Sequence, residues 1–458
     1  MRIHLIAIGG AAMHNLAIAL NYNHHTVTGS DDEIYNPAKE RLHKYDLLPQ
    51  EMGWHPERIT KDIDVIILGM HARKNNPELK KSKKLGLKIY SYPEFLFQHA
   101  KDKQRVVIAG SHGKTTTTSI ILHILKSNKI DFDYLVGAQI EGFDSMVRLS
   151  DAPLMVVEGD EYLSSPIDRR PKILHYKPHV TVITGIAWDH INVFPTFENY
   201  KSQFAKYIKT IEKGGTLFYY KNDEHVNDIL KKIKKPIFEA KGYEAIESTL
   251  KNGKTIISDG NGKSVGLGIF GKHNLENLRA AYLVCKKVGV TDAQFFKTIK
   301  TFKGAAKRLQ LLKKTKSCLA YLDFAHAPSK VEATIKALKV QHPKRKLIVC
   351  LELHTFSSLN KKFLTEYART MNSADKAVVY FSEHTLEMKK LPPISIDEVK
   401  AAFDHPNIEV VTNNAKVLSI LKRFKWENKN LAMMTSGNFG GLDLKKEATA
   451  LLKKQVDM

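Results

Sequence analysis

A glycine turn that carries a lysine and threonines follows the short apolar run at residues 106–109. Backbone amides at the amino end of a helix bind phosphate oxygens, a lysine neutralises their charge, and a hydroxyl binds Mg²⁺. The turn therefore predicts a site for ATP and Mg²⁺. Only two residues separate its glycines, where the usual loop has four, so a chance glycine-lysine turn is the alternative. The turn consists of Gly110, Ser111, His112, Gly113, Lys114, Thr115 and Thr116.

Two further apolar runs end in residues that suit the same chemistry. The run APLMVVEGDEY reaches its first acidic residue at Glu158, and HVTVITGIAWDH ends in Asp189 and His190. The carboxyl ends of neighbouring parallel strands meet at one edge of a sheet, where such sheets bind ligands. We therefore expect Thr115 and Glu158 to bind a metal that accompanies the phosphates. A solvated acidic turn and a structural histidine are the alternatives.

The segment GIFGKHNLENLRAAYLV, residues 268–284, carries two asparagines three positions apart, Asn274 and Asn277. This spacing puts both amides on one face of the helix that begins here. An amide offers a donor and an acceptor, which suits the edge of an adenine ring. A helix cap followed by a polar helix face is the alternative.

Short apolar runs alternate with helical patterns along the whole chain, which predicts an α/β fold with parallel strands. A new strand begins near residue 105, and another series of strands and helices begins near residue 304. We expect three α/β domains, at 1–104, 105–303 and 304–458.

The formal net charge is +23 over 458 residues, which raises the question of nucleic acid. The lysines are spread along the chain, without an arginine-rich arm, so a solvated lysine-rich surface and no nucleic-acid partner are expected. No apolar stretch has the length of a membrane span and no leader pattern is present, so a cytoplasmic protein is expected. The three cysteines lie far apart in apolar segments and are predicted to be core thiols: Cys285, Cys318 and Cys350.

Taken together, these segments resemble the Mur ligases, ATP-dependent enzymes that build the peptide of peptidoglycan precursors. The short glycine loop, the glutamate at Glu158, the Asp-His pair and the His-Asn-x-x-Asn segment match the family in order. Further matches are Arg308 in AAKRLQLL and Asp323 in LDFAHAP. The resemblance covers the chain and implies a Rossmann-like N-terminal domain for the UDP-sugar, a central ATPase domain and a Rossmann-like C-terminal domain.

The resemblance also implies roles for individual residues. Lys114 would neutralise the transferred phosphoryl group, and His190 would bind a second Mg²⁺. Arg308 and Asp323 would reach ATP from the third domain, so that domain closure completes the site. The remaining match, at the adenine, is to His273, Asn274 and Asn277.

Two positions depart from the family. Relatives commonly carry asparagine where this chain has Gly185, and some carry a carbamylated lysine where this chain has Phe204. We therefore do not expect that modification.

The implied substrate is UDP-N-acetylmuramate, whose lactoyl carboxylate would be activated as an acyl phosphate. The segments at 27–37, with Ser30 and Asp31, and at 433–445 favour the branch that adds the tripeptide L-alanyl-γ-D-glutamyl-meso-diaminopimelate in recycling. The segment LELHTFSSL, with His354, favours the alternative, L-alanine addition. His326 and His354 are candidates to face the incoming amine, or are ordinary strand-end histidines. A monomer or weak homodimer is expected.

Three other functions remain open from the sequence. A folate polyglutamate ligase would lack the first 104 residues. A P-loop nucleic-acid ATPase has only the net charge in its favour. A UDP-sugar binder without catalysis would not need Lys114.

Overall fold

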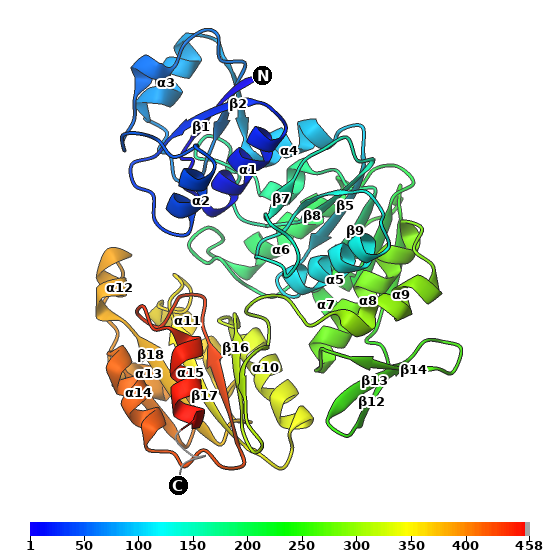
Figure 1. Cartoon of the computed structure of the whole chain (residues 1–458), viewed down its shortest axis with the longest axis vertical. Coiled ribbons are helices and arrows are strands. Elements are labelled where there is room, and N and C mark those ends of the chain that lie inside the picture. The colour runs from blue at the N-terminus through cyan, green and yellow to red at the C-terminus, as the bar shows by residue number, and fades with distance from the viewer. Residues whose placement is uncertain (454–458) are drawn as a thin grey trace. The chain divides into compact units, whose positions relative to one another are not determined.

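The structure is a computed structural model, and it describes residues 1–453. Four separate sheets run along the chain, and parallel pairing dominates three of them (Figure 1). This confirms the predicted α/β class. The described residues form two compact units, the first mostly from residues 1–186 and 198–244, the second mostly from 245–278 and 299–453. The short segment at 187–197 belongs to the second unit.

The first sheet is fully parallel and has the strand order β2-β1-β3-β4. Near-continuous apolar runs such as VIIL build it, because both faces of a parallel sheet are covered by helices. The strands are β1 (Arg2–Ile6), β2 (Thr26–Ser30), β3 (Val65–Leu68) and β4 (Lys88–Ser91). The helices are α1 (Ala11–Tyr22), α2 (Ala38–Lys44), α3 (Pro77–Lys84) and α4 (Tyr92–Ala100).

The second sheet has the order β11-β10-β9-β5-β8-β6-β7, and only β7 runs antiparallel. The strand that precedes the glycine turn therefore lies between β8, which ends at Glu158, and β9, which ends at Ile183. The strands are β5 (Gln104–Ala109), β6 (Asp133–Leu135), β7 (Val147–Arg148), β8 (Leu154–Glu158), β9 (Val180–Ile183), β10 (Thr216–Tyr220) and β11 (Glu239–Tyr243). The helices are α5 (Lys114–Ser127), α6 (Phe197–Ile208), α7 (Glu224–Lys231), α8 (Lys272–Lys287) and α9 (Asp292–Thr298).

A small antiparallel sheet, β12-β13-β14, was not predicted from the sequence. Its strands are β12 (Ser248–Lys251), β13 (Lys254–Ser258) and β14 (Ser264–Leu267). All four residues of β12 are exposed, so its pattern carries no apolar alternation.

The C-terminal sheet has the order β15-β16-β20-β17-β18-β19, parallel except for β15. Its core is two layers, because alternate strand residues face opposite sides. The strands are β15 (Gln310–Lys314), β16 (Leu319–Asp323), β17 (Lys346–Leu353), β18 (Lys376–Phe381), β19 (Ile408–Val411) and β20 (Lys429–Met434). The helices are α10 (Pro328–Gln341), α11 (Lys361–Leu364), α12 (Glu383–Met388), α13 (Ile396–Phe403), α14 (Asn414–Lys422) and α15 (Leu444–Lys453).

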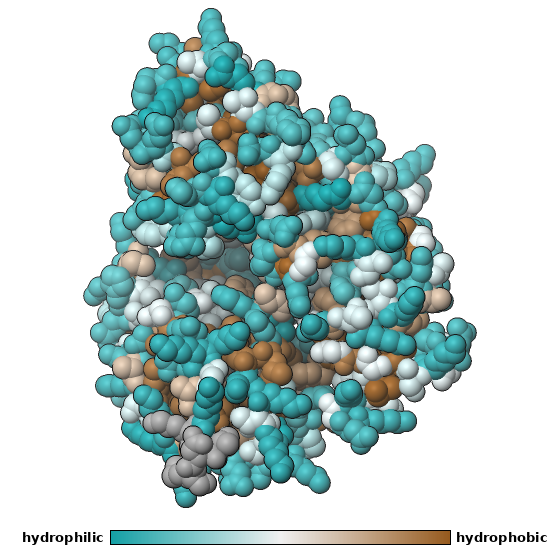
Figure 2. All heavy atoms as spheres, viewed as in Figure 1, coloured by the Kyte–Doolittle hydropathy of each residue, from teal (hydrophilic) through white to brown (hydrophobic). Residues whose placement is uncertain are grey.

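Burial and surface agree with the expectations from composition. Cys285, Cys318 and Cys350 are buried free thiols, as predicted. Hydrophilic residues cover most of the face shown in Figure 2, in keeping with a lysine-rich solvated surface. None of the helices in residues 1–453 is both long and apolar enough to cross a bilayer.

Candidate active site

The glycine turn forms the link between β5 and the amino end of α5, the place where a helix offers free amides to an anion. Gly110 has φ +122°, and a Cβ there would lie 2.2 Å from Thr184 Oγ1. Gly113, at φ +72°, caps the helix in the left-handed region. Both glycines are therefore required by the backbone, which supports a shaped phosphate cradle over a chance turn.

Lys114 is held in a network of short contacts. Its Nζ donates to Gly110 O at 2.6 Å and lies 2.7 Å from Glu161 Oε2. Burial favours the neutral amine, but Glu161, Asp160 and Glu158 outweigh burial and raise the pKa of Lys114. The lysine is therefore a permanent cation at the phosphate-binding turn.

Thr115 and Glu158 lie together, as the sequence predicted for a metal site. Thr115 Oγ1 donates to Glu158 Oε1 at 2.7 Å, and the other carboxylate oxygen accepts from Gly137 N at 2.7 Å. A hydroxyl and a carboxylate oxygen are hard donors that suit Mg²⁺. The chemistry and closeness of these donors fit the ion that would accompany ATP.

Glu161 and Tyr200 belong to this arrangement but were not chosen from the sequence. Glu161 is 1% exposed, and Tyr200 OH donates to its Oε1 at 2.8 Å. Ser111 Oγ lies 2.7 Å from the same phenol oxygen. In the sequence, Glu161 is one of three acidic residues at or just after the end of β8, and nothing distinguishes the one that Tyr200 contacts.

Gly185 lies next to the glycine turn, and its carbonyl accepts from Ser111 N at 2.9 Å. Its φ is +137°, and a Cβ would lie 3.1 Å from Asp223 Oδ2. Glycine adopts this backbone conformation without the strain that a side chain would add.

The Asp189–His190 pair lies in the second compact unit. Asp189 is 7% exposed; its Oδ1 accepts from His190 N at 2.8 Å, and its Oδ2 lies 3.7 Å from Lys330 Nζ. Burial opposes ionisation, but Lys330, His190 and His326 together lower the pKa of Asp189. The carboxylate is therefore a fixed anion that orients the backbone of His190, which has φ +56°.

Asp323, at the end of β16, orders the segment that follows it. Its carboxylate accepts from Leu309 N at 2.6 Å and from Ala325 N at 2.7 Å. The Arg308 guanidinium lies 4.6 Å from the ring of Phe324. Burial raises the pKa of Asp323 against the opposing charge of Arg308. Arg308 and Asp323 thus lie on neighbouring segments of one unit.

His326 lies close behind Asp323 in the chain. Its Nδ1 lies 2.8 Å from Phe324 O, and burial is the main cause that lowers its pKa to about 4. The ring is therefore neutral near pH 7 and cannot supply a positive charge to a substrate.

His273, Asn274 and Asn277 lie in the first turns of α8, as predicted. Both asparagines are almost fully buried, and Asn274 Nδ2 donates to Phe270 O at 2.9 Å. That amide therefore uses one donor within its own helix start. Burial lowers the pKa of His273 to about 4, so this imidazole is also neutral near pH 7.

The first sheet places Ser30 and Asp31 differently from each other. Ser30 is 2% exposed, and its hydroxyl donates to the buried carboxylate of Glu78. Asp31 accepts from Gly9 N at 2.7 Å, in the turn after β1, and burial is the main cause that raises its pKa to about 6. Asp31 lies at the turn that follows β1, whereas the Ser30 hydroxyl is hydrogen-bonded inside the domain.

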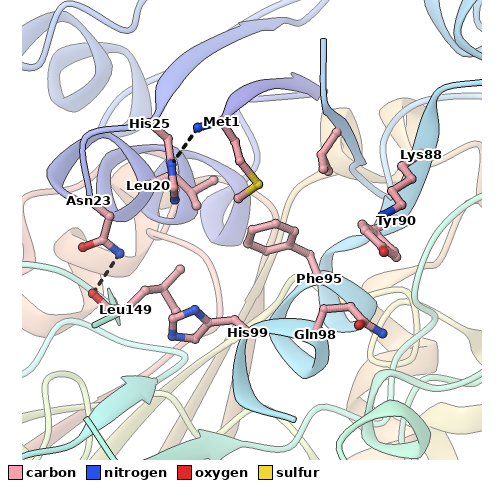
Figure 3. A pocket seen from close by; sticks show the side chains of 11 residues that line it. Met1, Leu20, Asn23, His25, Lys88, Tyr90, Phe95, Gln98, His99 and Leu149 are labelled. Atoms are coloured by element: carbon pink, nitrogen blue, oxygen red, sulfur yellow. Dashed lines mark hydrogen bonds between the residues drawn. The ribbon is translucent and has the colours of Figure 1, made fainter. Parts of the chain in front are cut away.

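A pocket of about 240 Å³ lies at the amino ends of β1, β3 and β4 (Figure 3). Leu20, Phe95 and Leu149 give it apolar walls, and His25 and His99 border it. None of the predicted site residues lines it. Ser30 and Asp31 lie at the carboxyl end of β2, at the opposite edge of the sheet, so this pocket is separate from these two predicted substrate residues.

Three family models match the chain in sequence. They are described as the Mur ligase family catalytic domain at residues 2–104, the Mur ligase middle domain at 108–285 and the Mur ligase glutamate ligase domain at 307–433. A UDP-N-acetylmuramate–L-alanine ligase of Caldicellulosiruptor saccharolyticus is 32% identical over 82% of this chain and 83% of its own length. The chain belongs to the Mur ligase family. Mur ligases are ATP-dependent ligases, and this chain is one of them.

Other relatives match this Mur ligase over nearly its full length. A UDP-N-acetylmuramate–L-alanine ligase of Dictyoglomus turgidum is 29% identical over 92% of both chains. The murein peptide ligase of Psychrobacter arcticus superposes with a TM-score of 0.68 at 21% identity, covering 100% of this chain and 99% of the other. The UDP-N-acetylmuramate–alanine ligase of Thermotoga maritima gives 0.69 at 18% identity, with 99% of each covered. These two superpositions establish the fold and do not separate the two substrates.

Proposed function

We propose that this Mur ligase uses ATP and Mg²⁺ to join the lactoyl carboxylate of UDP-N-acetylmuramate to an incoming amine. A carboxylate is a poor electrophile, so amide formation in water needs activation, and transfer of the terminal phosphoryl group of ATP gives an acyl phosphate that an amine attacks. The observation that carries the proposal is the convergence of Lys114, Thr115 and Glu158 at the amino end of α5.

The residues take distinct roles in this reaction. Lys114 and the amides of the glycine turn hold the transferred phosphoryl group and neutralise its charge. Thr115 and Glu158 hold one Mg²⁺, and His190 a second; the ions supply charge neutralisation for the phosphates. Asn274 and Asn277 are assigned to the adenine, and Arg308 and Asp323 to ATP from the third domain.

The amine has two candidates, and the comparisons favour L-alanine. The curated relatives from Caldicellulosiruptor saccharolyticus and Dictyoglomus turgidum are both named for L-alanine addition. The tripeptide, which the segments at 27–37 and 433–445 favoured, is therefore the second candidate. Its support is the similarity to a murein peptide ligase of Neisseria meningitides, which is 25% identical over 66% of this chain and 98% of its own length.

Phosphate release from ATP tests the proposal directly. The assay contains Mg²⁺, UDP-N-acetylmuramate and either L-alanine or the tripeptide L-alanyl-γ-D-glutamyl-meso-diaminopimelate. We expect release only when both the sugar nucleotide and one amine are present, and the productive amine identifies the branch. Lys114→Ala is the control that removes ATP chemistry. Phosphate release that does not depend on UDP-N-acetylmuramate would refute the substrate assignment.

The competing hypothesis is an ATPase that acts on nucleic acid. The proposal expects no change in ATP turnover on adding DNA or RNA. Stimulation that disappears at moderate salt would instead favour a nucleic-acid ATPase.

A further inference from the structure

The helices on the C-terminal sheet are divided between its two faces. Helices α10, α11 and α13 pack on one face, and α14 and α15 on the other. Strands β17 and β20 are parallel neighbours, yet β17 leads into α11 and β20 leads into α15 (Figure 1). Where neighbouring strands send their connections to opposite faces, ligands bind outside the carboxyl ends of the strands. The topology therefore points to the carboxyl ends of β17 and β20 as the place where this domain would bind a ligand.

The segment after β20 is fixed onto the end of β17. Glu352 is 3% exposed, and its Oε2 accepts from Phe439 N at 2.9 Å and from the Thr435 hydroxyl. A Cβ on Gly437 would lie 2.8 Å from Glu352 Oε2 and 3.0 Å from His354 Cγ. The backbone of the 435–439 segment therefore lies directly against these two side chains, and glycine permits this approach.

A buried hydroxyl without a partner lies in the same segment. Ser436 Oγ is shielded from solvent and makes no hydrogen bond within the described part of the chain. Buried hydroxyls in proteins normally have a partner, so this position favours a ligand or water that supplies one.

Lys389 extends from the end of α12 toward the residues that follow β17. Its Nζ lies 4.4 Å from the ring centroid of Phe356, which is 39% exposed. Within residues 1–453, no carboxylate pairs with this ammonium group, and burial lowers its pKa. A half-buried cation against an aromatic face without a counter-ion is a site that an anion would stabilise.

The pKa of His354 indicates that Lys389 lies close to this imidazole. Burial lowers the pKa of His354, Glu352 opposes this, and Lys389 adds to the lowering. The imidazole, the ammonium group and the aromatic ring therefore lie within one electrostatic neighbourhood at the end of β17.

We infer that Lys389, with Phe356 beneath it, binds a carboxylate of the incoming amine substrate at the ends of β17 and β20. The inference rests on the proposed function, because both candidate amines carry at least one carboxylate. Glu352 touches no substrate in this proposal; it positions the 435–439 segment. Lys389 is thus a specificity residue that selects acids over neutral amines.

Binding to the full chain tests the inference without relying on turnover. L-alanine and the tripeptide are each titrated against the wild-type protein, Lys389→Gln and Lys390→Gln by calorimetry or ligand-detected NMR. Lys390 is the exposed neighbour in the chain and serves as the matched control. We expect Lys389→Gln to weaken binding of the cognate amine roughly ten- to hundredfold, as for loss of a charge-assisted hydrogen bond. Equal affinities in the two variants would overturn the inference.

A second comparison tests whether the carboxylate is the group that Lys389 recognises. The wild-type protein should bind the cognate amine tenfold or more better than the same compound with its carboxylates amidated, such as L-alaninamide. Lys389→Gln should bind the two alike, and its kinetic defect should lie in the KM for the amine and not in that for ATP. Persistent discrimination in Lys389→Gln would show that another group reads the carboxylate.

The two proposals fail in different ways. If phosphate release does not depend on UDP-N-acetylmuramate but amine binding still depends on Lys389, the proposed function is wrong and the carboxylate site stands. If neither amine binds the wild-type protein, the carboxylate site is refuted.

Discussion

Lys114 and Glu161 form a nearly buried ion pair, with 2.7 Å between Nζ and Oε2, at the turn proposed to hold the phosphates of ATP. The lysine side chain is 16% exposed and the glutamate 1%. Breaking such a pair leaves a charge without compensation, which costs more than the pair itself contributes. The pair therefore links the stability of the central domain to the residue assigned to catalysis.

We predict that Lys114→Met abolishes catalysis and also destabilises the fold. Phosphate release should fall more than a hundredfold, since the cation that neutralises the phosphoryl group is lost. The free energy of unfolding should fall by about 3–5 kcal/mol, because the buried Glu161 carboxylate loses the cation that compensates its charge. Steady-state kinetics and urea unfolding measure the two effects.

The double variant Lys114→Met with Glu161→Gln separates these effects. Removing both charges should restore most of the lost stability while activity stays absent. A double variant as unstable as Lys114→Met would show that lost packing of the lysine side chain, and not the lost counter-charge of Glu161, causes the destabilisation.

Gly185 carries a second prediction, which concerns the backbone. Gly185→Ala should lower the free energy of unfolding by about 2–3 kcal/mol, because φ +137° is unfavourable for alanine and the new methyl meets Asp223. Asp223 also caps α7 through Val226 N at 2.8 Å and accepts from Ile186 N at 2.7 Å. Displacing this carboxylate therefore weakens the neighbouring backbone as well.

Gly214→Ala provides the matched control for strain alone. Gly214 also has a positive φ, +76°, but no atom lies within 4 Å of the place that the new methyl group would occupy. Its cost should be about 1 kcal/mol, the ordinary penalty of a left-handed alanine. Equal losses in urea unfolding for the two variants would show that the contact with Asp223 does not matter.

The phosphate turn was predictable because its chemistry is local in sequence. Strand, glycines, lysine and helix start lie within residues 106–122, and the backbone alone places Thr115 at the amino end of α5. The same locality let the α/β class be read from short apolar runs. Where a feature depends on neighbours in sequence, the pattern sufficed.

Long-range partners were not predictable in the same way. The sequence does not indicate that Tyr200 donates to Glu161, or that the Ser30 hydroxyl donates to Glu78. Both contacts join residues about 40 or more positions apart. Only the packed fold decides which of several acidic or hydroxyl side chains is turned inward.

Acid sensitivity of the second compact unit follows from three histidines. Burial is the leading cause that lowers the pKa of His273, His326 and His342 to about 4. In the unfolded chain a histidine titrates near 6.5. Because these histidines stay neutral in the native protein, the folded state keeps its full stability above about pH 6.5. The free energy of unfolding then falls as the pH drops toward 4, where the unfolded chain binds protons more readily.

We predict that His342→Gln flattens this dependence. Between pH 7 and pH 5 the wild-type protein should lose about 1–2 kcal/mol of unfolding free energy per histidine, and the variant should lose one such share less. His384→Gln, at a residue whose side chain is 77% exposed, is the control and should keep the wild-type slope. The same slope in both variants, by urea unfolding at several pH values, would contradict this account.

Lys330 is predicted to support catalysis without touching substrate. It lies 3.7 Å from Asp189, whose other oxygen accepts from His190 N, so the lysine fixes the carboxylate that orients the proposed metal ligand. Lys330→Gln should lower kcat about tenfold and raise the Mg²⁺ concentration needed for half-maximal rate. Lys336→Gln, on the same helix and 60% exposed, should change neither.

The double variant Lys330→Gln with Asp189→Asn tests whether Lys330 acts on catalysis through its ion pair with Asp189. If Lys330 acts through Asp189, the double variant should be no slower than Asp189→Asn alone, because the second substitution removes a contact that is already lost. Additive losses in kcat would mean that Lys330 acts by another route. A Lys330→Gln enzyme with the rate and Mg²⁺ dependence of Lys336→Gln would show that His190 needs no such support.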